Sequence, residues 1–189
     1  MPTGSWLYSY LFIWTLILVQ FAAIILLTRQ VSGMMNHWVR NDPDWGLPLG
    51  SLAPELPDKD YYDKDIDKIL GEGRKRIIFF LSSTCHTCDE AILRVWAISE
   101  LPELEVVLAI QASDINLRLF LTKHGYVEPK TVTIIRDEKG LVAGAYKATV
   151  VPFVVVVSSM GRIAAKRTAI TAAEISMLLR QADAFEAAT

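Results

Sequence analysis

A continuous apolar run, Ile77 to Leu81, comes shortly before the only two cysteines of the chain, Cys85 and Cys88. An uninterrupted run of this length is typical of a strand that is buried on both faces of a sheet. The residues that follow the cysteines carry apolar side chains at the 3–4 spacing of an amphipathic helix. The sequence therefore predicts a buried strand, then a Cys-x-x-Cys sequence, then a helix that begins at the cysteines.

This arrangement of the two thiols predicts a dithiol redox site. Cys85 would lie beside the unpaired N–H groups and the positive end of the helix, which stabilise a thiolate. We expect Cys85 to be the nucleophile and charged His86 to help stabilise its thiolate. We expect Cys88, one turn further and more buried, to be the resolving thiol. The direction of electron flow stays open, because Asp89 and Glu90 oppose the charge of His86.

Other uses of the two cysteines fit the sequence less well. A metal site needs about four ligands, and only Cys85, Cys88 and His86 cluster in the sequence, so we expect no metal. Covalent haem attachment needs His directly after the second cysteine, where Asp89 stands. A peroxidase would need a separate peroxidatic cysteine. We therefore expect no cofactor beyond the Cys85–Cys88 disulfide. A non-catalytic membrane adaptor with a structural disulfide stays open as the alternative.

The N-terminal segment predicts a single membrane anchor. The uncharged run from Trp6 to Leu27 would be roughly 33 Å long as a helix, which matches a hydrocarbon core of about 30 Å. No basic residue precedes the run and no clean small-x-small cleavage site follows it, which favours an uncleaved anchor over a signal peptide. We expect residues 6–27 to contact lipid, within an anchor of residues 1–29 that is followed by a tether of residues 30–50.

The charges beside this anchor leave its orientation open. Arg29 and Arg40 follow the apolar run, which by the positive-inside tendency favours a cytoplasmic C-terminal part. Asp42 and Asp44 offset these two charges. Over the whole chain the formal net charge is −2 and the only basic cluster is Arg74 to Arg76, so we expect no nucleic-acid partner.

The remaining residues, roughly 140 of them, are enough for one core-forming domain. Apolar strand patterns alternate in this part with helical ones, and a strand hairpin and a helix close the chain. A capping box, Thr171-x-x-Glu174, opens the last helix, and Asp114 could cap an earlier one. The fold class is therefore α/β with a mixed sheet. Besides 77–81, the expected strands are 104–110, 132–135, 150–157 and 162–166.

This order of elements resembles the thioredoxin superfamily, in which a Cys-x-x-Cys helix start is followed by further β/α units, a proline before a strand, a hairpin and a final helix. The anchor, the Gly50-to-Pro54 lead-in and the long gap between Cys88 and Pro152 resemble its membrane-anchored TlpA/MauD-like branch. Within that branch the chain is similar to the MauD type, the methylamine-utilisation accessory proteins. The residues that carry this similarity are Phe79 to Cys85, Leu104 to Ile110, His124-Gly125 and the anchor.

The resemblance implies a thioredoxin-like domain, residues 51–185, with a mixed sheet flanked by helices and preceded by one transmembrane helix. It also implies a cis peptide bond before Pro152, so that the backbone of Val151 and Pro152 contacts the partner chain. The implied activity is thiol–disulfide exchange or isomerisation on cysteines of exported proteins, such as the small subunit of methylamine dehydrogenase. The domain would face the periplasm or cell exterior from the bacterial cytoplasmic membrane, and an unidentified partner would recharge the dithiol.

The sequence departs from the thioredoxin pattern at two positions beside the dithiol. His86 and Thr87 stand between the cysteines, where many members of the superfamily have a proline. The buried acid of thioredoxin aligns with Phe79, so no carboxylate is expected there to accept the proton of Cys88. Another group or water must then serve as the base.

Overall fold

The structure of the chain is a computed structural model that describes residues 5–40, 45–66, 73–99, 101, 104–126, 132–168 and 171–188. The chain divides into two compact units, Met1–Asp42 and Pro43–Thr189.

The first unit contains one long helix, α1 (Ser5–Arg40). Within α1, the stretch Tyr8–Ile25 is long and apolar enough to cross a membrane, judged by length and composition. The helix continues beyond the predicted anchor, residues 1–29, into the predicted tether, because no proline interrupts the chain before Pro43. Residues 41–44 of that tether lie outside the described residues, and the predicted domain limits stay a prediction.

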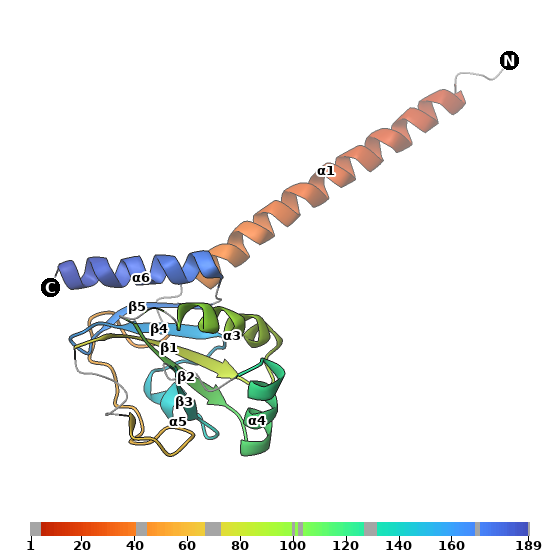
Figure 1. Cartoon of the computed structure of the whole chain (residues 1–189). Coiled ribbons are helices and arrows are strands. Elements are labelled where there is room, and N and C mark those ends of the chain that lie inside the picture. The colour runs from red at the N-terminus through yellow and green to blue at the C-terminus, as the bar shows by residue number, and fades with distance from the viewer. Residues whose placement is uncertain are drawn as a thin grey trace. The chain divides into compact units, whose positions relative to one another are not determined.

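The second unit is built on one five-stranded mixed sheet, as predicted (Figure 1). The strand order is β3-β2-β1-β4-β5. Strand β1 (Lys75–Ser82) pairs in parallel with β2 (Leu104–Gln111), which pairs in parallel with β3 (Val132–Arg136). On the other side, β1 pairs antiparallel with β4 (Phe153–Val157), which forms the predicted hairpin with β5 (Ile163–Thr168). The carboxyl ends of the three parallel strands therefore lie at one edge of the sheet.

Helices cover both faces of this sheet. Buried residues of α3 (His86–Ile98), α4 (Asp114–Lys123) and α6 (Ala172–Ala187) share one hydrophobic cluster with Phe79 of β1. The short helix α5 (Leu141–Ala145) and the lead-in segment, residues 45–66, contribute to a second cluster on the opposite face, with Phe80. Alternate side chains of the Ile77–Leu81 run thus enter opposite clusters, and each is at most 1% exposed. The predicted strand buried on both faces is confirmed.

The helix starts follow the predicted capping chemistry in one case and differ in another. Thr171 and Glu174 form the predicted capping box at the start of α6. At the start of α4 the N-cap is Ser113, whose side chain accepts a hydrogen bond from the backbone N–H of Asn116, and not Asp114. The carboxylate of Asp114 instead bonds to Tyr61, a residue far away in the sequence.

Candidate active site

The two cysteines lie where β1 gives way to α3. Cys85 is the N-cap of α3 and has an extended backbone, with φ −96° and ψ 115°. Its carbonyl accepts a hydrogen bond from the backbone N–H of Cys88, at 3.1 Å, so the first turn of the helix holds the two residues together. Both side chains are free thiols in this structure. The dithiol therefore lies at the carboxyl edge of the parallel strands, at a helix N-terminus.

The thiol of Cys85 is half-buried and is surrounded by hydrogen-bonding groups. Its Sγ lies 3.1 Å from the Thr87 hydroxyl and 3.8 Å from the Val151 carbonyl oxygen. Partial burial alone would raise the pKa of this thiol. Hydrogen bonds from the Cys88 thiol, the Thr87 hydroxyl and the backbone N–H groups of both residues outweigh the burial, so the net pKa of Cys85 is lowered. Cys85 is accordingly the more readily ionised of the two thiols.

Cys88 has the opposite environment. It is fully buried and belongs to the same hydrophobic cluster as Phe79. Burial, together with the hydrogen bond to Cys85, raises the pKa of the Cys88 thiol to about 12. The site therefore combines an accessible thiol that ionises readily with a sealed thiol that holds its proton.

The groups that surround Cys88 bear on where its proton can go. Phe79 and Cys88 belong to one hydrophobic cluster, and both are fully buried. The alignment of Phe79 with the buried acid of thioredoxin stays a prediction. Asp89 adds a negative charge near Cys88 and contributes to its raised pKa. The Asp89 carboxylate accepts hydrogen bonds from Lys123, at 2.7 Å, and lies 2.8 Å from Nε2 of His124. These two partners lower the pKa of Asp89, which makes it a weaker base.

The predicted site residues other than the cysteines differ in whether they contact Cys85 Sγ. The Val151–Pro152 peptide bond is cis, as the resemblance implies, and the Val151 carbonyl faces Cys85. His86 is an exposed residue at the start of α3. Among the described residues, the side chain between the cysteines that contacts Cys85 Sγ is that of Thr87 rather than His86. The roles predicted for His86, Val151 and Pro152 stay predictions.

Sequence reasoning missed two contributors to this site. Thr87 could have been found, since a hydroxyl two residues after an N-cap cysteine can fold back onto the sulfur. The cluster of Asp89, Lys123 and His124 joins two helices and leaves no local signal in the sequence.

Comparison with solved structures identifies the fold. A Chlorobium tepidum protein assigned as the thiol:disulfide interchange protein DsbE is 18% identical, with a TM-score of 0.60, over 74% of this chain and 98% of that chain. A secreted Mycobacterium tuberculosis disulfide oxidoreductase homologous to Escherichia coli DsbE is 15% identical, with a TM-score of 0.52, over 68% of this chain and 95% of that chain. At these identities the likeness concerns the fold, and the class that fold and dithiol define is a thioredoxin-like protein.

A curated relative narrows the resemblance within this class. The chain is 25% identical over 177 residues to the methylamine utilization protein MauD of Paracoccus versutus. The aligned residues cover 90% of this chain and 86% of that protein. No protein-family model matches the chain. Together, the relative and the solved structures confirm the predicted resemblance to the thioredoxin superfamily and its MauD type.

Proposed function

We propose that the chain is a membrane-anchored thiol–disulfide oxidoreductase that acts on cysteines of exported proteins. The observation that carries this proposal is the difference in exposure and in pKa between the two thiols. Cys85 is accessible, has a lowered pKa and faces the Val151 carbonyl, whereas Cys88 is sealed behind it with a pKa of about 12. A structural disulfide requires neither an accessible sulfur nor this difference in acidity, so the geometry favours exchange over the adaptor alternative.

The chemistry of exchange follows from these positions. The Cys85 thiolate attacks a client disulfide, a bond forms between Cys85 and one client sulfur, and the other client sulfur leaves and takes up a proton. Cys88 then loses its proton and attacks Cys85, which releases the second client sulfur and leaves a Cys85–Cys88 disulfide. Two electrons pass to the client. The same steps in reverse oxidise a client dithiol, and the partner that recharges the dithiol fixes the direction.

The compartment and the clients form the finer part of the proposal. Residues 6–27 would hold the chain in the bacterial cytoplasmic membrane, with the thioredoxin-like domain in the periplasm or outside the cell. The similarity to a methylamine utilization protein supports clients that function in methylamine use, with the small subunit of methylamine dehydrogenase as the first candidate. An oxidising compartment is also where client disulfides persist.

Trapping of the mixed disulfide tests the exchange mechanism. In Cys88→Ala the resolving thiol is absent, so mixed disulfides between Cys85 and client cysteines should accumulate and appear on non-reducing gels. The matched control, Cys85→Ala, should trap none. If Cys88→Ala captures no client and Cys85→Ala leaves thiol exchange at the parent level, the protein is an adaptor. A membrane-impermeant thiol reagent applied to intact cells tests the compartment, because a cytoplasmic domain would be labelled only after lysis.

A further inference from the structure

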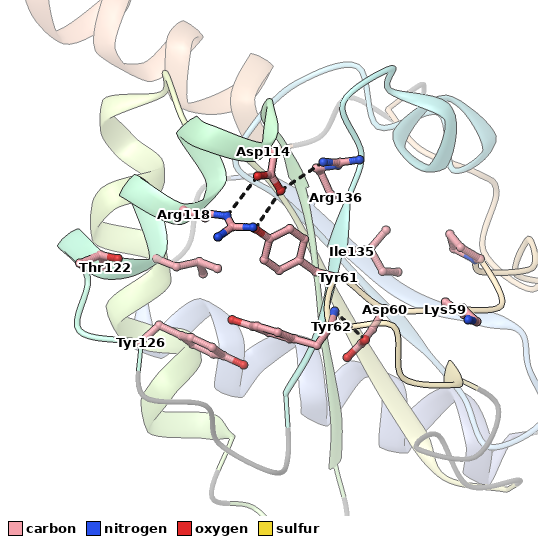
Figure 2. A pocket seen from close by; sticks show the side chains of 12 residues that line it. Lys59, Asp60, Tyr61, Tyr62, Asp114, Arg118, Thr122, Tyr126, Ile135 and Arg136 are labelled. Carbon is pink, nitrogen blue, oxygen red and sulfur yellow. Dashed lines mark hydrogen bonds and ion pairs between the residues drawn. The ribbon is translucent and has the colours of Figure 1, made fainter.

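A concave surface lies beside α4, and neither Cys85 nor Cys88 lines it. It has a cavity volume of about 710 Å³ and is formed by the lead-in segment, α4, the residues after α4 and the end of β3. Figure 2 shows Arg118 and Tyr61 on one side of this space and Tyr62 and Tyr126 on the other. The buried side chains of Leu121 and Ile135 also line it. We call this surface the α4 pocket.

One wall of the α4 pocket is cationic. The Asp114 carboxylate accepts hydrogen bonds from the Tyr61 hydroxyl at 3.0 Å, Arg118 Nε at 3.1 Å and an Arg136 terminal nitrogen at 3.2 Å (Figure 2). The Tyr61 hydrogen bond and the two guanidinium groups lower the pKa of Asp114, so it remains an anion. Two guanidinium charges share this one carboxylate, and the Arg118 side chain is 70% exposed. The wall keeps a net positive charge and can bind a further anionic group.

The opposite wall is aromatic. The rings of Tyr62 and Tyr126 are nearly parallel, with an interplanar angle of 9° and centroids 6.2 Å apart. Tyr126 also contacts Trp96 of α3, with 5.4 Å between centroids, and Tyr62 meets Tyr61 edge to face at 5.1 Å. Because each ring of this wall also contacts a further aromatic ring, the wall is a preformed platform for a planar or apolar side chain.

The cationic wall of the α4 pocket begins at the same edge of the sheet as the dithiol. Asp114 follows the carboxyl end of β2, Arg136 is the last residue of β3, and Cys85 follows β1. Strands β1 and β3 are two interstrand spacings apart, or roughly 10 Å. An extended polypeptide covers this distance with about three residues. Because Cys85 lies three residues beyond the end of β1, a chain bonded to it through its own cysteine needs somewhat more than three extended residues to reach the cationic wall.

We propose that the α4 pocket docks the client polypeptide through a segment that carries an acidic side chain beside an aromatic one, a few residues from the client cysteine. The acidic group binds Arg118 and Arg136, and the aromatic ring lies on Tyr62 and Tyr126. Arginine and tyrosine are the residue types that dominate binding energy in protein interfaces. This inference rests on the proposed exchange activity and adds a basis for client selection.

The test compares peptide substrates on the full-length protein in detergent. One substrate is the symmetrical disulfide of a peptide with glutamate and tyrosine four and three residues before its cysteine, and the other has lysine in place of glutamate. The parent should prefer the acidic peptide in kcat/KM. Arg118→Gln should reduce kcat/KM for the acidic peptide about tenfold, the usual effect of one lost charge-assisted hydrogen bond. The variant should not reduce kcat/KM for the lysine peptide, because it removes a charge that repels the lysine.

Three controls decide the outcome. Arg94→Gln removes an exposed arginine of α3 outside the pocket and should behave as the parent. Tyr62→Leu should weaken both peptides through the aromatic wall. Equal kcat/KM for the two peptides in the parent, or equal losses in the Arg94 and Arg118 variants, would overturn the proposal. So would competition by benzoate as strong as that by the cysteine-free acidic peptide, since the pocket would then be a small-anion site. Reaction with 2-hydroxyethyl disulfide reports exchange alone, and its absence in the parent would refute the proposed function instead.

Discussion

The contact between the Thr87 hydroxyl and Cys85 Sγ predicts a measurable loss of nucleophilicity in Thr87→Val. Valine has nearly the same shape but no hydroxyl, so the change removes one donor and leaves the helix start intact. The 3.1 Å contact is one of the hydrogen bonds that lower the pKa of Cys85. Its loss should raise the pKa of this thiol and reduce the fraction of thiolate at neutral or lower pH.

The magnitude follows from the worth of one hydrogen bond to a charged sulfur. Such bonds contribute about 1.5–3 kcal/mol when buried, and because Cys85 is only half-buried we take about 1 kcal/mol. That free energy corresponds to roughly a fivefold smaller thiolate fraction below the pKa. Alkylation of Cys85 by iodoacetamide should therefore slow roughly fivefold at pH values below the pKa of Cys85. The rates of parent and variant should converge at high pH, where Cys85 is ionised in both proteins.

The assay is the pH profile of the alkylation rate, with peptide mapping to separate Cys85 from the buried Cys88. Thr84→Val is the matched control, since the Thr84 hydroxyl contacts Ser82 at 3.0 Å and should not affect the profile. Profiles that coincide for the parent and Thr87→Val, or an equal displacement in the Thr84 variant, would refute the assignment of this hydrogen bond.

Three further predictions concern charges and caps. Asp89→Asn removes a charge that helps raise the pKa of Cys88. In a single-turnover assay, release of a preformed mixed disulfide should therefore accelerate about two- to threefold, as for one partly exposed charge. Glu90→Gln makes the same charge change one residue further on and should have a smaller effect. Asp137→Ala removes a buried carboxylate that accepts two backbone N–H groups of α5, and should cost about 2 kcal/mol in urea unfolding, with a smaller loss for Asp137→Asn. Thr171→Ala removes the N-cap of α6 and should cost about 1 kcal/mol in the same measurement.

These three predictions can each fail in a distinct way. Unchanged release kinetics in Asp89→Asn would mean that its carboxylate does not act on the resolving thiol. A loss below 0.5 kcal/mol in either stability variant, smaller than an ordinary cap or buried hydrogen bond, would mean that water replaces the lost contact.

The sequence predicted those parts of the fold that have a local cause. The Ile77–Leu81 run predicted β1 because a strand with neighbours on both sides and helices on both faces has no polar face. The Thr171–Glu174 spacing predicted the start of α6 because a capping box is closed within one turn. Helix α5 was not predicted, since five residues that include Gly144 are too few for a periodic pattern.

The candidate site, like the fold, was predictable only where its residues lie close together in the sequence. Cys85 and Cys88 lie on one helix turn, so their spacing alone indicated their relation. The contacts that adjust their acidity and surround the α4 pocket come from residues far apart in the chain. Asp89 meets His124, and Tyr61 meets Asp114, only because α4 packs beside α3 and the lead-in segment lies along β3. Spacing along a single sequence cannot reveal such pairs.

The enclosure of Cys88 has a consequence for every reagent that the protein meets. With no sulfur surface open to solvent at this residue, reductants and oxidants alike must bond to Cys85 first. Only one molecule can then be attached at any moment, and it always leaves from the same atom. In the proposed exchange, a client and a recharging partner would therefore use that single sulfur one after the other, and an abundant recharging partner would compete directly with the client.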